Sequence, residues 1–495
     1  MMLASTSLLR GLPSQLHISR RMSTIAFVAP HDPIKSSQAI SGVDLVQIWA
    51  QAVPSSTDES AKVPKVGTTR VFYNTPESKI TAISSLGEGF EKKKGNERRE
   101  MVRKSVGSAV KTLRGLDGLK EIHIDAEKDP HAAFFTLKTL PPSRFNPNLK
   151  EPIPEKITLK AIQNSKEWEE GAVYAYSQNL ARTLMELPAN IMTPTAFCER
   201  VKFEFAGVEN VELIVRDTAW AAEKGMNTFL SVTHGTSEPA KFLEIHYKGA
   251  PQKDAQPLAF VGKGITFDTG GISLKSRVGM KLMRGDMGGA ASVVSAALAI
   301  AKLKLPVNLV VCTPLTENMP GPSATKPGDI VYAMNGKTVE VDNTDAEGSL
   351  GFMRYTTTAT EYKPHTLIDV ATLTGAMVSA LGEIYTGVFS SSDKLWEKLN
   401  EAGEHEFDRF WRMPLSEDFG PQIYSSNADL CNTGGAAAGS CTAALFLKAF
   451  AEGIEPKEGE EPKMNWAHLD IAGTMEATRT YAVSGEGDDW EQCSV

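Results

Sequence analysis

From about residue 211 onward, short apolar runs rich in β-forming residues alternate with longer helical runs. The strand-like runs cover residues 211–215, 242–247, 258–262, 307–313 and 366–371, and the helical runs cover residues 290–303, 347–360 and 436–451. This alternation predicts an α/β fold with a mostly parallel sheet flanked by helices on both faces. Ligands of such sheets bind in the loops just past the carboxyl ends of the strands. We therefore expect the functional residues of this chain to lie in those loops.

The chain before this region has a different pattern of strand-like and helical stretches. Two β-rich stretches, residues 69–73 and 119–124, are mixed with a charged helical stretch at 96–113 and a helical pattern at 168–187. Thr193 followed by Pro194 then forms a good start for the next helix. We therefore expect a smaller N-terminal α/β domain over residues 31–187 and a larger catalytic domain over residues 188–495.

The first 30 residues contain no Asp or Glu, and they carry Arg10, Arg20 and Arg21 among leucines and serines. This composition is typical of a mitochondrial transit peptide, and the continuous apolar core of a secretory signal is missing. Residues 1–30 are thus predicted to be a transit peptide or a disordered leader. Met22 followed by Ser23 is also a plausible start of a cytoplasmic form.

Composition excludes several classes of protein. The 495 residues include 52 Lys and Arg against 60 Asp and Glu, and the net charge of −8 has the wrong sign for a sequence-independent nucleic-acid binder. No apolar run reaches the roughly 18 residues needed to span a bilayer. The five cysteines are odd in number and form no C-x-x-C pair, so a disulfide framework is not indicated. Neither nucleic acid nor a membrane is an expected partner.

Three short segments concentrate charged residues at predicted strand ends: residues 261–275, 283–290 and 343–348. The third follows a predicted hairpin through Asn335 and Gly336. Together the segments supply four carboxylates and two lysines, namely Asp268, Asp286, Asp345, Glu347, Lys263 and Lys275.

Each segment alone has other readings. Lys263 between two glycines suggests a phosphate loop, but the spacing of a Walker sequence is absent. Asp268-Thr269-Gly270 matches the aspartic-protease triplet, which needs a second copy that this chain lacks. Asp286 fits a helix cap, and residues 345–348 fit a turn that starts a helix.

The combination is better explained by metal binding. Four clustered carboxylates repel one another and raise one another's pKa values, whereas two divalent ions supply +4 against −4. A neighbouring dication can also displace the ammonium proton of Lys263 and accept the neutral amine. Two such ions activate a water and polarise a carbonyl, which is hydrolytic chemistry. The centre could also bind the free α-amine of a peptide and so restrict cleavage to the first residue.

With these residues, the chain resembles the leucine aminopeptidase (cytosol aminopeptidase) family of dinuclear metallopeptidases. The resemblance runs from about Leu180 to the C-terminus and rests on residues 261–275, the Asp286 segment, and residues 343–348, 371–376 and 466–473. It implies five metal ligands, of which Asp268 and Glu347 bridge the two ions: Lys263, Asp268, Asp286, Asp345 and Glu347. It also implies that Lys275 is the catalytic lysine that stabilises the oxyanion.

The resemblance further implies the surroundings of the centre. The residues that shape the pocket for the first side chain or hold the substrate backbone would be Met283, Asn343, Thr372, Leu373, Gly375, Ala472 and Met475. The implied cofactors are two divalent ions per subunit, zinc, manganese or magnesium. The implied partners are peptides with a free N-terminus and five further copies of the chain in a homo-hexamer.

One catalytic position departs from the family pattern. The family reads Asn-Thr-Asp-Ala-Glu-Gly-Arg-Leu, whereas this chain has Ser349 in place of the arginine. The family arginine anchors a bicarbonate ion that relays a proton, and a serine has neither the charge nor the reach for this role. Two hypotheses follow: a metal-dependent aminopeptidase of leucine-like preference with reduced activity, or a catalytically silent hexameric structural protein of the same fold.

Overall fold

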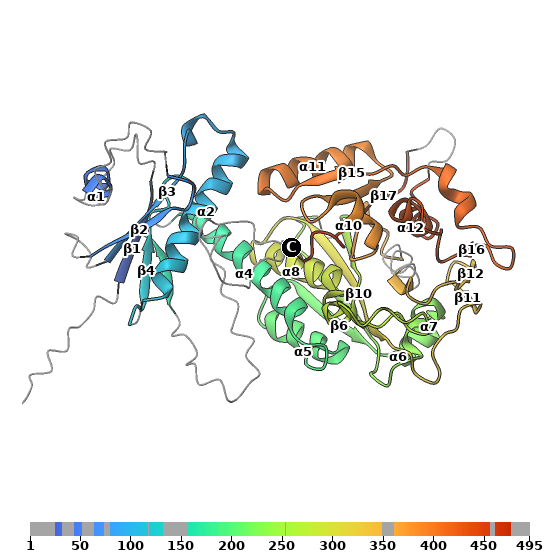
Figure 1. The fold of residues 1–495 in the computed structure, drawn as a ribbon. Coiled ribbons are helices and arrows are strands. Elements are labelled where there is room, and N and C mark those ends of the chain that lie inside the picture. The colour runs from blue at the N-terminus through green and yellow to red at the C-terminus, as the bar shows by residue number, and fades with distance from the viewer. Residues whose placement is uncertain are drawn as a thin grey trace, which may run out of the picture.

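The computed structural model has two α/β parts joined by a long helix, α4 (Lys166–Glu186) (Figure 1). It describes residues 25–31, 44–51, 64–73, 80–116, 118–131, 157–163, 165–252, 254–348, 361–455 and 461–476. Within these ranges no helix is both long and apolar enough to cross a membrane.

The N-terminal part is a five-stranded sheet with the spatial order β2-β3-β1-β4-β5. Its strands are β1 (Ile25–His31), β2 (Thr69–Tyr73), β3 (Ile80–Ser85), β4 (Glu121–Ile124) and β5 (Thr158–Ala161). β2 runs antiparallel to β3, and the other neighbours are parallel. Its helices are α1 (Leu45–Gln51), the short η1 (Phe90–Lys92) and α2 (Gly95–Arg114), which packs on the sheet through residues such as Val106 and Leu113.

The position of β1 corrects the predicted end of the leader. Residues 25–30, which the prediction of a leader over residues 1–30 includes, form most of β1 between β3 and β4. Ala26, Val28 and Ala29 are fully buried there. The physical reason is that this short apolar run can pair with a strand on each side. Residues 1–24 lie outside the described part of the chain.

The larger part is built on a nine-stranded sheet, with the order β15-β14-β17-β13-β8-β10-β7-β6 and with β9 paired to β10. The strands are β6 (Val211–Arg216), β7 (Lys241–Lys248), β8 (Leu258–Gly262), β9 (Ile265–Asp268), β10 (Asn308–Asn318), β13 (Thr366–Ala371), β14 (Thr386–Ser390), β15 (Phe410–Arg412) and β17 (Asn465–Asp470). The central strands β17, β13, β8 and β10 are parallel, and antiparallel pairing begins only at β7 and β14. The predicted mostly parallel α/β sheet is confirmed.

Helices cover both faces of this sheet. They are α5 (Pro194–Glu204), α6 (Thr218–Glu223), α7 (Asn227–Thr233), α8 (Gly288–Lys302), α10 (Gly375–Leu381), α11 (Asp393–Glu406) and α12 (Gly439–Lys448). Alternate residues of β10 point to opposite faces, as the period of a strand requires. Leu309 and Val311 pack with α4, α5, α8 and α11, whereas Val310 and Cys312 pack with α6, α7 and α12.

A small third sheet lies beside the larger one, with the order β11-β12-β16. Its strands are β11 (Ile330–Tyr332), β12 (Thr338–Glu340) and β16 (Leu430–Cys431). The larger part also contains two short helices, η2 (Met280–Gly285) and η3 (Glu417–Gln422). β11 and β12 form the predicted hairpin, with Gly336 at φ 85° in its turn.

Helix α4 belongs to both parts. Trp168, near its start, packs in the core of the N-terminal sheet, whereas Leu184 and Met185, near its end, pack with α8 in the core of the larger part. The predicted division between residues 187 and 188 falls just after the end of α4. In the structure, however, α4 contributes residues to the cores of both parts.

Candidate active site

The first charged segment folds around β8 and β9. Lys263 directly follows β8, and Asp268 is the last residue of β9. Gly270 then takes a φ of +87°, a conformation that side chains other than glycine strongly disfavour. The chain turns back, the backbone N–H of Lys275 donates to Thr269 O at 2.9 Å, and the side chain of Lys275 returns to Asp268.

The second and third segments approach from the other side. Asp286 lies between η2 and α8, and α8 packs tightly on β13, because a Cβ on Gly289 would lie 2.0 Å from Val370 O. Asp345 and Glu347 lie in the loop that follows β12, and a helix begins at Glu347. The three segments therefore meet at the carboxyl end of the central strands.

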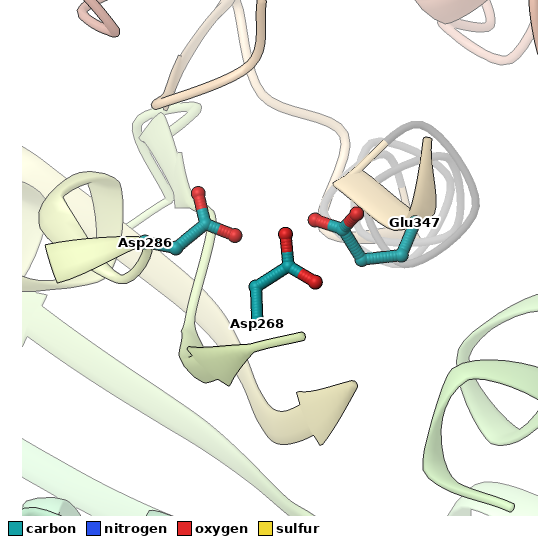
Figure 2. A group of neighbouring side chains, drawn as sticks. All are labelled: Asp268, Asp286 and Glu347. Atoms are coloured by element: carbon teal, nitrogen blue, oxygen red, sulfur yellow. The ribbon is translucent and has the colours of Figure 1, made fainter. Parts of the chain in front are cut away.

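Three carboxylates form the centre of this site. Asp268, Asp286 and Glu347 each place one oxygen within 4.8 Å of the oxygens of the other two. Figure 2 shows the three side chains, from three separate segments of the chain, turned toward a common space. They are 2%, 6% and 2% exposed, so water screens their mutual repulsion poorly.

Lys263 lies among these carboxylates. Its Nζ is 2.8 Å from Asp286 Oδ1 and 2.9 Å from Glu347 Oε1, and it donates to Thr372 O at 3.0 Å. Burial lowers the pKa of Lys263, but the carboxylates of Asp286, Glu347 and Asp268 outweigh this effect and raise it above its ordinary value. With these neighbours alone the lysine is an ammonium.

Lys275 connects the fourth carboxylate to the group. Its Nζ is 2.8 Å from Asp268 Oδ2, and it also contacts Asp345 Oδ1. Burial lowers the pKa of Lys275, but the carboxylates of Asp268 and Glu347 outweigh this effect and raise it above its ordinary value. Asp345 is the most exposed carboxylate of the site, and it is tied to the others through this lysine.

The donor set fits divalent cations. Four carboxylates face two ammonium groups, which leaves a formal excess of two negative charges. Asp286 Oδ2 is buried and has no hydrogen-bond partner in the structure. Burial raises the pKa of Asp286 well above its ordinary value, and the carboxylates of Glu347 and Asp268 add to this against the opposing effect of Lys263. A cation would relieve both the repulsion and the unpaired oxygen.

A polar residue that sequence reasoning missed supports the centre. Asn318, the last residue of β10, donates from Nδ2 to Asp268 Oδ1 at 2.9 Å and to Thr344 O at 3.0 Å. Gly270 N donates to the same oxygen of Asp268 at 2.8 Å. The strand predicted from the sequence covers residues 307–313, and Asn318 follows it by five residues, near the edge of the sheet where ligands bind.

Several residues expected around the first side chain of a substrate lie in the loop after β13. Thr372 donates from Oγ1 to Asp286 Oδ1 at 2.7 Å, so it contacts the carboxylate cluster directly. Leu373 lies close to Gly348, where an added Cβ would be 2.9 Å from Leu373 Cδ1. Gly375 is the first residue of α10, and no atom lies within 4 Å of an added Cβ there.

The other expected pocket residues approach from two more elements. Met475 contacts Gly285, directly before Asp286, and Met283 is half-buried in η2. Ala472 lies in the loop after β17. Asn343 accepts from the backbone N–H of Asp345 at 2.9 Å through Oδ1, and this contact shapes the third segment. Ser349 lies outside the described residues, as does all but the start of the helix predicted at 347–360.

Known proteins are similar to this chain in sequence and in fold. The sequence model of the cytosol aminopeptidase family, catalytic domain, matches residues 179–489. A cytosol aminopeptidase of Dictyostelium discoideum is 44% identical over 434 residues, which are 84% of this chain and 81% of that protein. The human cytosol aminopeptidase is 42% identical over 419 residues, which are 83% of this chain and 79% of that protein.

Among solved structures, a bottromycin maturation enzyme in complex with Mn aligns with a TM-score of 0.75 and 26% identity, covering 92% of this chain and 93% of that chain. These matches and the buried carboxylate cluster define the class of protein, a metal-dependent aminopeptidase. The chain belongs to the cytosol aminopeptidase family. The predicted family resemblance is thereby confirmed.

Proposed function

We propose that this aminopeptidase removes the first residue, with a leucine-like preference, from peptides that have a free N-terminus, and that it does so with two divalent ions. The observation that carries the proposal is the group of four carboxylates, three of them buried, and two lysines at the carboxyl ends of the central strands. Zinc, manganese and magnesium are the candidate ions. All the donor atoms are carboxylate oxygens and one amine nitrogen, which suit these ions.

The residues that would hold the ions are Lys263, Asp268, Asp286, Asp345 and Glu347. When bound, the pair supplies Lewis-acid polarisation of a carbonyl and a water of lowered pKa. Lys263 would join as a neutral amine, which requires loss of the proton that the carboxylates hold on it in their present arrangement.

Lys275 would stabilise the negative charge that develops on the substrate carbonyl oxygen. Its raised pKa keeps it charged at neutral pH, and it lies on a turn fixed by Gly270. A fixed cation in a partly buried site stabilises an oxyanion more than a mobile one in water does. The carboxylates that now pair with Lys275, Asp268 and Asp345, are themselves candidate ligands, so ion binding would compete for them.

The preference for the first residue would be set by an apolar pocket. Leu373 and Met475 come from the loops after β13 and β17, and Met283 comes from η2. Apolar side chains of this size suit a leucine-like residue, and Asn343 would hold the substrate backbone.

Ser349 is expected to slow this reaction without removing the metal site. It stands where the family has an arginine, and it is not among the candidate ligands. General-base assistance is typically worth about 10²–10⁴ in rate, and this loss is the expected cost. The same residue supports a second candidate function, a catalytically silent hexameric structural protein whose metals serve stability.

Hydrolysis of leucine amide by the purified protein distinguishes the two functions. The wild-type chain and the variant Ser349→Arg are assayed with manganese or zinc, with and without a chelator. We expect slow, chelator-sensitive release of leucine by the wild type and a faster rate in Ser349→Arg. No turnover by wild type with recovery in Ser349→Arg would favour the silent protein. No turnover by either would contradict the aminopeptidase proposal.

Location and assembly complete the proposal. The acid-free, arginine-containing composition of residues 1–24 supports import into mitochondria, with a cytoplasmic form as the alternative. Mass spectrometry of the N-terminal peptide of the protein isolated from mitochondria tests this, because cleavage would remove the three arginines. We also propose a homo-hexamer, and light scattering coupled to gel filtration would show a mass six times that of the chain.

A further inference from the structure

Asp470 is a buried carboxylate outside the metal cluster. It is the last residue of β17 and is 1% exposed. Its Oδ1 accepts from the backbone N–H of Leu373 at 3.3 Å and from that of Ala472 at 3.2 Å, and its Oδ2 accepts from Thr374 Oγ1 at 2.6 Å. One side chain therefore holds the loop after β13 and the loop after β17 together.

These two loops carry most of the candidate pocket for the first side chain. Leu373 belongs to one loop and Ala472 to the other, and Met475 follows Ala472 by three residues. Thr374 also accepts from Met377 N at 3.2 Å and bonds to Ser440 Oγ at 2.8 Å, so the same contact fixes the start of α10. Hydrogen bonds to a carboxylate are about twice as strong as those between neutral groups.

We propose that Asp470 is a positioning residue that sets the width of the first-side-chain pocket and hence the preference of the enzyme for large over small first residues. The inference rests on the proposed function, because the pocket is assigned there. Asp470 acts through Leu373 and Ala472. None of its hydrogen bonds in the described part of the chain goes to a candidate metal ligand.

The test compares Asp470 with a matched carboxylate. Asp369 on the neighbouring strand β13 is also fully buried, and it accepts from Trp466 Nε1 at 2.5 Å and pairs with His468. Those partners lie within β17 and away from the pocket loops. The variants Asp470→Ala, Asp470→Asn and Asp369→Asn are measured for kcat/KM on leucine amide and alanine amide, for bound metal and for the unfolding midpoint.

We expect Asp470→Ala to lower the leucine-to-alanine ratio of kcat/KM about tenfold with bound metal unchanged, the size of effect that a methylene-scale misfit has in an apolar pocket. Asp470→Asn keeps one acceptor oxygen, so its leucine-to-alanine ratio should lie between the ratios of Asp470→Ala and wild type. If Asp470→Ala does not fold, Asp470→Asn alone carries the comparison. Asp369→Asn should lower the unfolding midpoint and leave the ratio unchanged.

A ratio that stays within twofold of wild type in the Asp470 variants would overturn the inference, as would an equal change in Asp369→Asn. If wild type hydrolyses neither amide, the proposed function has failed on its own account. The same comparison is then made by calorimetric titration of the manganese-loaded proteins with leucine and with alanine, and the ratio of the two Kd values replaces the ratio of kcat/KM.

Discussion

Asn318 holds a carboxylate of the centre without being a candidate ligand. Its Nδ2 donates to Asp268 Oδ1, and this contact fixes the direction of the oxygens that face the cluster. Replacing a partner of a metal ligand typically weakens metal binding about 10–100-fold. We therefore expect Asn318→Ala to raise the Kd for Mn²⁺ by about this factor in calorimetric titrations.

The matched control is Asn308→Ala at the other end of the same strand. Asn308 donates from Nδ2 to Ala255 O at 2.9 Å, far along β10 from the cluster. Its variant should bind Mn²⁺ as wild type does. Equal affinities for the Asn318 and Asn308 variants would show that Asn318 does not orient Asp268.

For single residues of the site, the sequence predicts which charged residues take part but not which other residues support them. Lys263, Asp268, Asp286, Asp345, Glu347 and Lys275 were identifiable because they fall in short glycine-containing segments at strand ends, and the structure brings all six together. Asn318 and Asp470 act on partners 50 and 97 residues away in the chain, respectively, and no local spacing records such pairs.

Among the elements, α8 depends on a close approach to the sheet. A Cβ on Gly289 would lie 2.0 Å from Val370 O, and backbone on both sides leaves little room to adjust. Gly289→Ala should therefore lower the free energy of unfolding by about 1–3 kcal/mol, as overpacking of a tight core does. Denaturant titration measures the change.

Gly95→Ala is the corresponding control in another helix. Gly95 is the first residue of α2, and no atom lies within 4 Å of an added Cβ. Alanine forms helix better than glycine, so this variant should be neutral or slightly more stable than wild type. A loss in Gly95→Ala as large as that in Gly289→Ala would contradict the explanation by close approach.

The pairing of β13 with β17 includes a buried ion pair between Asp369 and His468. Burial lowers the pKa of His468, but the carboxylates of Asp369 and Asp470 raise it above its ordinary value. Because the pKa is higher in the folded state, the contribution to stability is complete below the unfolded value of about 6.5 and is lost as the pH rises through the folded value.

His468→Gln should therefore cost more stability at pH 6 than at pH 9. Removing one partner of a buried pair costs about 3–5 kcal/mol when the other stays charged. Denaturant titrations of wild type and variant at the two pH values give the difference. An equal loss at both would mean that the charge of His468 contributes nothing.

The burial of polar residues in β17 also explains which strands could be predicted from the sequence. β8, β10 and β13 were predictable because a strand buried on both faces is an apolar run. β17 contains an asparagine, a histidine and an aspartate in six residues, and the side chains of His468 and Asp470 are buried against partners on other segments. Such a strand has no apolar run. These residues are therefore identified only as part of a family motif, and the sequence predicts no strand there.

For the whole molecule, contacts between α2 and α11 help α4 to tie the two parts together. Arg103 on α2 donates to Glu406 O and to Glu406 Oε2, both at 2.6 Å, where α2 faces the end of α11 (Figure 1). The Arg103 side chain is only 7% exposed. Arg103→Ala should lower the free energy of unfolding by about 2 kcal/mol, within the usual range for a buried partner.

The control for this contact is Arg98→Ala. Arg98 pairs with Glu91 at 3.5 Å within the N-terminal part, and both side chains are exposed. Exposed pairs contribute about 0–1 kcal/mol, so this variant should change little. Chemical denaturation followed by tryptophan fluorescence compares the two. Similar losses would show that the Arg103 contact does not stabilise the joined molecule.

Composition described the molecule only on average. The net charge of −8 combines an acid-free N-terminal segment with a site that holds four acids, three of them buried. The end of the leader could not be read from composition, because β1 begins only four residues after Arg21 and only its pairing with β3 and β4 assigns its residues to the sheet.

The central claim is that the buried cluster is the metal-dependent centre of an aminopeptidase. The most direct measurement is the rate of leucine release from leucine amide as manganese is restored stepwise to chelator-treated protein. We predict no activity in the stripped protein and a rate that rises and saturates at two ions per chain. Activity that survives complete removal of metal, or no activity at any metal content, would contradict the claim.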